Sequence, residues 1–322
     1  MKEIRWGTIG CGKVTEIKSG PGFQKAEGSR LVAVMRRNGE LARDYAERHH
    51  VPKWYDNAEE LIDDHEVDAV YIATPPAYHM QYTLAAAKAG KPVYVEKPMG
   101  LTFEECQQMI AACKATSVSL FVAYYRRALP RFIKIKELLD NEVIGNVRFV
   151  TSTQYRKPSA VDRCKENLPW RIDPSIAGGG YFYDVGSHTL DIIDYLLGPF
   201  KEVNGYASNQ AGLYPAEDIV TGCYTLESGV HGTGIWCFSA YEEKEMNEIV
   251  GDKGIISFST FGEDICIKTE GEETHLSINS PTHIQQPLIQ TIVNELLGKG
   301  ACPSTGISAA RTNWVMDRMT GK

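Results

Sequence analysis

The sequence predicts an α/β protein in which a doubly wound parallel sheet is followed by an α+β domain with a large, mostly antiparallel sheet. Up to residue 124, short β-rich runs alternate with amphipathic stretches, as in repeated βα units that share a parallel sheet. From residue 147 to residue 275, most segments instead alternate polar and apolar residues, as strands with one covered face do. The length of 322 residues exceeds the size at which a single core usually stops growing, so two domains are expected.

The first domain is expected to span residues 1–124. Its strand candidates are the runs at 4–9, 31–35, 69–73, 93–95 and 119–123. Its helix candidates lie between these strands, at 39–48, 57–64, 77–89 and 102–115. Ser19-Gly20-Pro21-Gly22 is expected to end the helix after the first strand early, because glycine and proline are unfavourable inside a helix.

The second domain is expected to span residues 125–322 and to carry substrate binding and oligomerisation. A helix candidate follows Leu129-Pro130 and ends near Asp140. Alternation marks strand candidates at 203–208, 220–226, 230–239 and 255–261. Further helix candidates lie at 181–197, 284–297 and 306–319, and the last of them is free to pack back on the first domain.

Composition and charge exclude several classes of protein. The formal net charge is -7 and no basic stripe is present, so nucleic acid is not an expected partner. No apolar run reaches membrane-spanning length, and the chain starts on a strand rather than a secretory signal. The eight cysteines are scattered, without a C-x-x-C pair or a Cys/His cluster at zinc spacing, which indicates reduced thiols in a cytoplasmic protein.

A glycine-containing turn after the first strand predicts a dinucleotide-binding domain of the Rossmann type. Gly10 and Gly12 occupy the positions where a tight turn and a close approach to a pyrophosphate are needed. Lys13 and Val14 open the following helix, whose N-terminus attracts anions. Thr15 replaces the third glycine of the usual fingerprint, so an ordinary glycine turn between strand and helix stays open as an alternative.

The end of the second strand favours NADP over NAD. An acidic residue that binds the ribose hydroxyls of NAD is expected there, but the sequence reads Met35-Arg36-Arg37-Asn38. Two guanidinium groups match a 2′-phosphate in charge and in planar geometry, and they offer no acceptor to a ribose diol. Two alternatives stay open, because the arginines could sit on a solvated strand end or stack on the adenine of either cofactor.

Further motifs follow in a defined order along the chain. They are Thr74-Pro75 with His79, Glu96-Lys97-Pro98, Trp170-Arg171, Gly178-Gly179-Gly180, and Asp184-x-Gly186-x-His188-x-x-Asp191. Together with the glycine turn, these motifs resemble those of the glucose-fructose oxidoreductase, inositol dehydrogenase and rhizopine-catabolism (Gfo/Idh/MocA) oxidoreductase family. The resemblance covers essentially the whole chain.

The resemblance implies roles for several of these residues. Thr74, Pro75 and His79 are expected near the nicotinamide ribose, and the turn at Glu96 and Lys97 presents the lysine to substrate and cofactor. A purely structural hydrogen bond is the competing interpretation of His79. Trp170 and Arg171 lie in a long loop, 158–177, and are counted with the cofactor-binding residues because such loops often cover active sites.

The helix candidate at 181–197 carries a candidate acid–base group. Asp184 and His188 are four residues apart, so the carboxylate can orient the imidazole one turn away. Asp191 and Tyr195 continue the same face, which would look similar if it were merely solvated. The triple glycine upstream favours a ligand site, because glycine lets backbone approach a ligand closely. A metal held by Asp184, His188 and Asp191 is disfavoured, because no further ligand completes a set.

These features predict an NAD(P)-dependent dehydrogenase or reductase. We expect hydride transfer between nicotinamide and a secondary alcohol or carbonyl of a sugar, polyol or similar small compound, with Lys97, His188 and Asp184 as catalytic residues. The alternatives are a dihydrodiol or non-sugar carbonyl oxidoreductase, and a dinucleotide- or sugar-binding sensor without turnover. The resemblance also implies a homodimer or homotetramer. The sequence leaves open the exact substrate, the direction, and whether Lys97 or His188 is the proximal acid–base group.

Overall fold

The computed structural model describes residues 2–164, 166 and 168–322, which form two compact units. The first unit contains residues up to 100, 104–129 and 281–310, and the second contains 101–103, 130–280 and 311–322. Residues 281–310 thus join the first unit, although their place in the sequence assigns them to the second domain. No helix among the described residues has both the length and the apolar character needed to cross a membrane.

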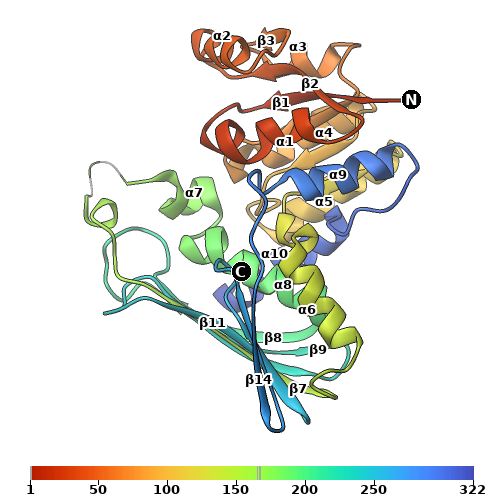
Figure 1. The fold of residues 1–322 in the computed structure, drawn as a ribbon. Coiled ribbons are helices and arrows are strands. Elements are labelled where there is room, and N and C mark those ends of the chain that lie inside the picture. Colours follow the sequence, from red (N-terminus) through yellow and green to blue (C-terminus); the bar gives the residue numbers. More distant parts are fainter. Residues whose placement is uncertain (1, 165, 167) are drawn as a thin grey trace. The chain divides into compact units, whose positions relative to one another are not determined.

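The first unit is built on a six-stranded parallel sheet with the order β3-β2-β1-β4-β5-β6 (Figure 1). Its strands are β1 (Ile4–Ile9), β2 (Ser29–Met35), β3 (Lys53–Tyr55), β4 (Ala69–Ile72), β5 (Val93–Val95) and β6 (Leu120–Val122). The order reverses direction between β1 and β4, and open sheets of this kind bind ligands at that reversal, beyond the carboxyl ends of the strands. The predicted doubly wound sheet is confirmed.

Helices connect these strands. They are α1 (Gly20–Lys25), α2 (Gly39–Arg48), α3 (Ala58–Asp63), α4 (His79–Lys88) and α5 (Phe103–Ala115). A further helix of this unit, α9 (Gln286–Leu296), comes after the last strand of the chain and packs against α1. Asn38 begins α2 where the sequence predicts, because its side chain accepts a hydrogen bond from the amide of Leu41 and satisfies a helix-end donor. Trp6 of β1, Phe23 of α1 and Tyr94 of β5 form a buried aromatic core, in which the ring centroids of Trp6 and Phe23 lie 4.9 Å apart.

The expected helix break at Ser19–Gly22 is wrong. Residues Thr15–Ser19 form a π-helical turn (η1) that runs directly into α1. Pro21 is tolerated because it lies in the first turn of α1, where the missing amide is not needed. Gly22 allows α9 to pack closely, since a Cβ at this position would lie 2.9 Å from Ile289 Cδ1.

The second unit is built on an eight-stranded sheet with the order β14-β13-β12-β11-β7-β10-β9-β8. Its strands are β7 (Val147–Tyr155), β8 (Phe200–Ser208), β9 (Ile219–Leu226), β10 (His231–Cys237), β11 (Lys244–Gly251), β12 (Gly254–Phe258), β13 (Asp264–Thr269) and β14 (Glu272–Ser277). Every neighbouring pair is antiparallel except β7 and β10. The predicted mostly antiparallel sheet is confirmed.

Helices α6 (Pro130–Asp140) and α8 (Ser187–Leu197) cover one face of this sheet. Phe132 of α6 packs edge-on against Phe258 of β12, with ring centroids 6.0 Å apart. Thr189 of α8 shares a 3.0 Å hydroxyl contact with Thr260. The shorter helix α7 (Pro174–Ala177) precedes α8, and α10 (Gly306–Thr320) crosses the boundary between the units at residue 310.

Candidate active site

The glycine turn after β1 has the geometry that a bound phosphate requires. Gly10 has a φ of +96°, and a Cβ there would lie 3.0 Å from the backbone of Ala73 and Thr74, so only glycine fits. Around Gly12 the space is open, because the nearest atom to a Cβ would be Gly10 O at 3.9 Å. Lys13 beyond it is exposed. The turn therefore leaves its outer side clear for an anion at the helix start.

Thr15 stabilises this turn in place of the third glycine of the fingerprint. Its hydroxyl and its amide both donate to Gly12 O, at 2.8 and 3.0 Å. Its own carbonyl accepts a hydrogen bond from Tyr45 of α2 at 2.9 Å. Val14 is half-buried at the start of the helix. The departure from the usual motif is thus compensated by the hydroxyl hydrogen bond to Gly12 O, which a glycine could not make.

Arg36 and Arg37 extend from the carboxyl end of β2 and are both exposed. The amide of Arg36 donates to Tyr55 O at 3.1 Å, which fixes the backbone at this position. The guanidinium of Arg37 stacks on the ring of Tyr78, 5.4 Å from its centroid. Tyr78 follows β4 in a short 3-10 turn, η2 (Pro76–Tyr78), and sequence reasoning did not single it out.

The segment after β4 fits a ligand at this edge. The hydroxyl of Thr74 is buried and has no hydrogen-bond partner among the described residues. A buried polar atom without a partner is unfavourable, so it points to a group that the bound dinucleotide would supply. Pro75 is half-buried beside it. The Gly10 turn and Thr74 together therefore fit the dinucleotide that the sequence predicts.

His79 has a positioning role. Its side chain is fully buried, and its ring nitrogens lie 3.0 Å from Pro98 O and 2.8 Å from Thr74 O. Burial lowers the pKa of this imidazole. The ring thus ties the segment after β4 to the turn that contains Lys97. Any contribution of His79 to cofactor binding passes through this backbone.

Glu96 holds the Lys97 turn in place through the hydrogen bonds of its carboxylate. Its carboxylate accepts hydrogen bonds from Tyr71 at 2.6 Å and from Gln285 at 2.7 Å. Tyr94 in turn donates to Gln285 at 3.0 Å, and the other carboxylate oxygen of Glu96 accepts from the amide of Lys97 at 3.2 Å. Gln285 comes from the segment just before α9, almost two hundred residues further along the chain. No local pattern could have assigned it to this site.

In the second unit, Asp184 and His188 lie on two different kinds of helical turn. Asp184 belongs to a π-helical turn, η6 (Phe182–Gly186), and His188 to the first turn of α8. His188 and Asp191 are 4% and 1% exposed, so the solvated-face interpretation is wrong. The imidazole of His188 meets the ring of Phe261 edge-on, with centroids 5.9 Å apart.

The triple glycine serves internal packing rather than a ligand. All three glycines are buried. A Cβ at Gly178 would lie 2.8 Å from Leu101 O, and one at Gly180 would lie 2.6 Å from Glu217 O. Gly178 also has a φ of +84°. The space that the missing side chains leave is therefore filled by protein, which overturns the expected ligand contact.

A cavity of about 430 Å³ adjoins Asp184 within the second unit. It is lined by Gln154, Tyr155, Arg156, Tyr181, Asp184, Val185, Phe238, Glu243, Lys244, Glu245 and Phe261. Arg171 pairs with Asp184 at 3.1 Å and stacks on Trp170, 4.5 Å from its ring centroid. Of the predicted loop residues, Arg171 thus contacts a residue of the cavity wall, and Trp170 stacks on Arg171. Lys165 and Asn167 of the same loop lie outside the described residues.

Arg156 and Tyr181, which are half-buried in the cavity wall, form a polar cluster with the buried Asp162. Arg156 pairs with Asp162 at 3.1 Å and stacks on Tyr181, 4.3 Å from its ring centroid. Tyr181 also donates a hydrogen bond to Asp162. Burial and the neighbouring carboxylate raise the pKa of Tyr181 to about 12, so its hydroxyl stays protonated at neutral pH. Sequence reasoning missed this cluster because its members are separated along the chain.

The fold and the phosphate turn define an NAD-binding oxidoreductase with a Rossmann domain. Comparison with known proteins identifies the group. The family model described as "Oxidoreductase family, NAD-binding Rossmann fold" matches residues 4–124. The family model described as "GFO/IDH/MocA C-terminal domain" matches residues 132–257. The chain belongs to the Gfo/Idh/MocA oxidoreductase family, which confirms the resemblance seen in its motifs.

Individual relatives extend over most of the chain. Oxidoreductase P35 of Formosa agariphila is 41% identical over 320 residues, which are 99% of this chain and 98% of the relative. The 1,5-anhydro-D-fructose reductase of Ensifer adhaerens is 30% identical over 70% of this chain and 67% of its own length. The structure of the aldose-aldose oxidoreductase of Caulobacter crescentus, complexed with glycerol, is 25% identical and has a TM-score of 0.87, covering 98% of this chain and 96% of that chain.

Proposed function

We propose that the protein transfers hydride between NADP and a secondary alcohol or carbonyl carbon of a sugar, polyol or similar small polar compound. The observation that carries the proposal is the carboxyl edge of the parallel sheet, where Gly10, the Thr74 hydroxyl and the Arg36–Arg37 pair end neighbouring strands. Bound nicotinamide supplies the hydride acceptor or donor. The protein's own side chains bind and orient the substrate and the cofactor, and they move the hydroxyl proton.

The cofactor choice rests on Arg36 and Arg37. Neither side chain is covered by protein, and no carboxylate follows β2 to accept hydrogen bonds from a ribose diol. Arg37 is held in place by Tyr78, so its guanidinium is partly preorganised for a phosphate or an adenine ring. NAD would keep the pyrophosphate contacts at Gly12, Lys13 and the helix start but would lose those to the 2′-phosphate.

Arg36→Asp should weaken NADP binding by about 10- to 100-fold, because a charge-assisted hydrogen bond contributes on the order of 1.5–3 kcal/mol. The affinity of the Arg36→Asp variant for NAD should equal that of wild type or exceed it. Arg43→Asp, on the exposed face of α2, makes the same charge change and should leave the ratio of the two affinities unaltered. Titrations with the fluorescent reduced cofactors, NADPH and NADH, measure both constants. Equal wild-type affinities for NADP and NAD, unchanged in Arg36→Asp, would show that this assignment is wrong.

The substrate class is supported by the cavity and by the relatives. Tyr181, Phe238 and Phe261 offer aromatic surface for the C–H face of a ring. Gln154 has a buried carbonyl oxygen without a partner among the described residues, which is suited to a hydroxyl donor. Relatives named for anhydrofructose reduction and aldose oxidoreduction act on the same chemical class.

We assign the transfer of the substrate hydroxyl proton to Lys97 and His188. Lys97 is half-buried at the end of β5, on a turn that Glu96 and His79 hold rigidly. His188 is almost fully buried, and its imidazole ring can both accept and donate a proton. Asp184 is held in place by its ion pair with Arg171, and we assign it the role of positioning the groups at this end of the site. Either Lys97 or His188 can be the group closest to the oxygen.

Lys97→Ala and His188→Ala should each lower kcat by about 10²–10⁴, which is the usual contribution of a positioned acid–base group. The affinity for NADP should change little. Lys88→Ala and His65→Ala remove exposed residues of the same types and should keep wild-type rates. Initial rates from cofactor absorbance, with NADP titrations on the same preparations, provide the comparison. A folded Lys97→Ala variant with wild-type turnover would refute the catalytic assignment.

A substrate panel separates the proposal from its two alternatives. Sugars and polyols, dihydrodiols, and simple carbonyl compounds form its three arms, each measured in both directions. Turnover confined to the second or third arm would favour the dihydrodiol or non-sugar carbonyl oxidoreductase. NADP binding without turnover in any arm would favour a sensor. The intact Lys97, Asp184 and His188 support an enzyme over a sensor.

A further inference from the structure

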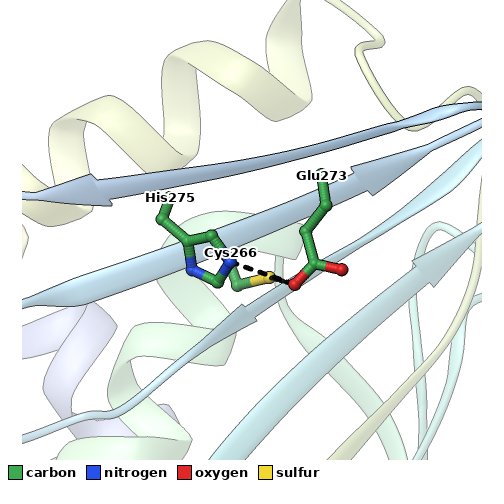
Figure 2. A group of neighbouring side chains, drawn as sticks. All are labelled: Cys266, Glu273 and His275. Carbon is green, nitrogen blue, oxygen red and sulfur yellow. Dashed lines mark hydrogen bonds and ion pairs between the residues drawn. The ribbon is translucent and has the colours of Figure 1, made fainter.

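A thiol, an imidazole and a carboxylate meet on the outer face of the β13–β14 hairpin, away from the cavity residues. Figure 2 shows Cys266, Glu273 and His275 directed toward one another. Glu273 Oε1 lies 3.0 Å from His275 Nε2 and 3.6 Å from Cys266 Sγ. Their donor atoms all lie within 4.8 Å of one another, and no other group of three His, Cys, Asp or Glu residues in the described ranges meets this criterion.

The register of the hairpin fixes this arrangement. Cys266 is the direct cross-strand partner of His275, and Glu273 precedes His275 by two residues on the same face. A two-residue turn with Gly271 at a φ of +80° joins the strands, so the pairing has little freedom to slip. Figure 2 shows the three side chains on two adjacent strands. They are preorganised by the sheet rather than by a flexible loop.

We propose that Cys266, Glu273 and His275 bind a divalent zinc-type metal ion, with water in the fourth position. Metal–ligand bonds of about 2.0–2.3 Å in a tetrahedron place ligand atoms about 3.3–3.6 Å apart, close to the distances of 3.0 and 3.6 Å from Glu273 Oε1 to His275 and to Cys266. Cysteine, histidine and carboxylate are the ligands that zinc uses in proteins, whereas calcium and magnesium take oxygen ligands alone. His275 and Glu273 are 68% and 48% exposed, which leaves room for the solvent ligand.

Charge and protons balance in this site. The ion replaces the thiol proton of Cys266, and the imidazole carries its own proton on Nδ1, so a thiolate, a carboxylate and the dication sum to zero. Metal binding therefore releases one proton for each site that is filled. Lys268 pairs with Oε2 of Glu273 at 3.3 Å, which keeps Oε1 directed at the other two ligands.

The test uses cobalt(II) as a spectroscopic probe on the untagged, metal-stripped full chain. Wild type should bind one cobalt ion with a thiolate-to-metal charge-transfer band, which added zinc abolishes. Cys266→Ser should lose the band, and His275→Ala and Glu273→Gln should each weaken binding at least about tenfold. Cys223→Ser is the matched control, because Cys223 is an exposed thiol that points from β9 to the same sheet face, and it should behave as wild type.

Two results would overturn the proposal. One is the absence of a charge-transfer band in wild type at millimolar cobalt, and the other is a band that persists in Cys266→Ser. Thermal unfolding guards against a folding defect, because zinc should raise the Tm of wild type and of Cys223→Ser but not that of Cys266→Ser. Turnover should be unaffected by Cys266→Ser, since none of the three ligands lines the cavity beside Asp184.

Discussion

At the scale of single residues, side chains at the carboxyl edge of the parallel sheet divide into those with unused hydrogen-bonding capacity and those that hold the backbone. Thr74 and the two arginines after β2 keep hydrogen-bonding capacity that protein does not use. The side-chain polar atoms of His79 and Glu96 form hydrogen bonds within the protein, and these bonds set the position of the Lys97 turn. The assignment of His79 to the cofactor site stays a prediction, and its ring contacts with the backbone carbonyls of Pro98 and Thr74 mean that it would act through that backbone.

Glu16 gives the phosphate-turn helix a contribution to stability that depends on pH. Arg48 and His49 donate to its carboxylate at 2.8 and 2.7 Å and hold its pKa at about 2, against an ordinary 4.5. Because this pKa is depressed, the contribution is complete above about pH 4.5 and is lost as the pH falls from there through about 2. Glu16→Gln should therefore lower the free energy of unfolding at neutral pH, by about 1 kcal/mol or less because solvent screens the pair.

Urea unfolding of wild type and Glu16→Gln across an acidic pH series measures this effect. The difference between the two proteins should shrink as the pH falls below about 4.5. Glu47→Gln is the control, since its pair with Arg43 is largely exposed and should give little difference at any pH. A Glu16→Gln difference that stays constant down to the lowest pH would contradict this account.

At the scale of elements, the helix after β1 depends on a residue that sequence rules regard as a breaker. Gly20 accepts no side chain, because a Cβ there would lie 2.3 Å from Thr15 O and 2.4 Å from Tyr45 Oη. The glycine therefore lets α2 pack against the π-helical turn and lets Tyr45 hold the carbonyl of Thr15. A local helix penalty is outweighed by close packing of one element on another.

Gly20→Ala should lower the free energy of unfolding by about 1–3 kcal/mol, which is the usual cost of overpacking. It should also weaken NADP binding, because the displaced Thr15 carries the hydrogen bonds that shape the phosphate turn. Gly300→Ala is the matched control, since a Cβ there would meet nothing closer than 3.9 Å. Denaturant unfolding and NADP titration test both effects. Unchanged stability in Gly20→Ala would mean that the π-helical turn relaxes freely.

At the scale of the whole molecule, the eight-stranded sheet has one bare face. Helices α6 and α8 cover the other face, whereas Phe149, Ile235 and Met246 remain 36–42% exposed on strands β7, β10 and β11, and Tyr206 of β8 is 85% exposed. Apolar side chains gathered on an exposed sheet favour association with a second copy. We propose that the part of this face on β7, β8, β10 and β11 forms the homodimer contact, that the β13–β14 hairpin with Cys266 and His275 lies outside the contact, and that a tetramer would need a further surface.

Phe149→Asp combined with Ile235→Asp should convert the dimer to monomer at micromolar concentrations, because each places an unpaired charge in a buried contact. Ile133→Asp, on α6, changes an equally exposed apolar residue off this face and should leave the dimer intact. Sedimentation velocity over a concentration series measures the equilibrium. A wild type that sediments as a monomer throughout would remove the proposed contact.

The sequence by itself determined the two-part architecture and the place of the phosphate turn. The first strand and α2 coincide with their predicted bounds, because their apolar period and the Asn38 cap are local signals. It missed β3, a three-residue edge strand that pairs only with β2 and has no alternation long enough to detect. The motifs also predicted the family correctly, since their order along the chain is itself a sequence property.

Only the tertiary structure decided how residues distant in the chain meet. Gln285 reaches Glu96, and Cys266 faces His275, through strand register and helix packing that have no local signature. The triple glycine and Gly20 are needed because other segments occupy the space of their side chains, and a sequence pattern does not reveal that space. The burial of His188 follows from the same cause. Local periodicity specifies an element and its inward face, whereas packing against distant segments decides which polar groups keep free capacity for chemistry.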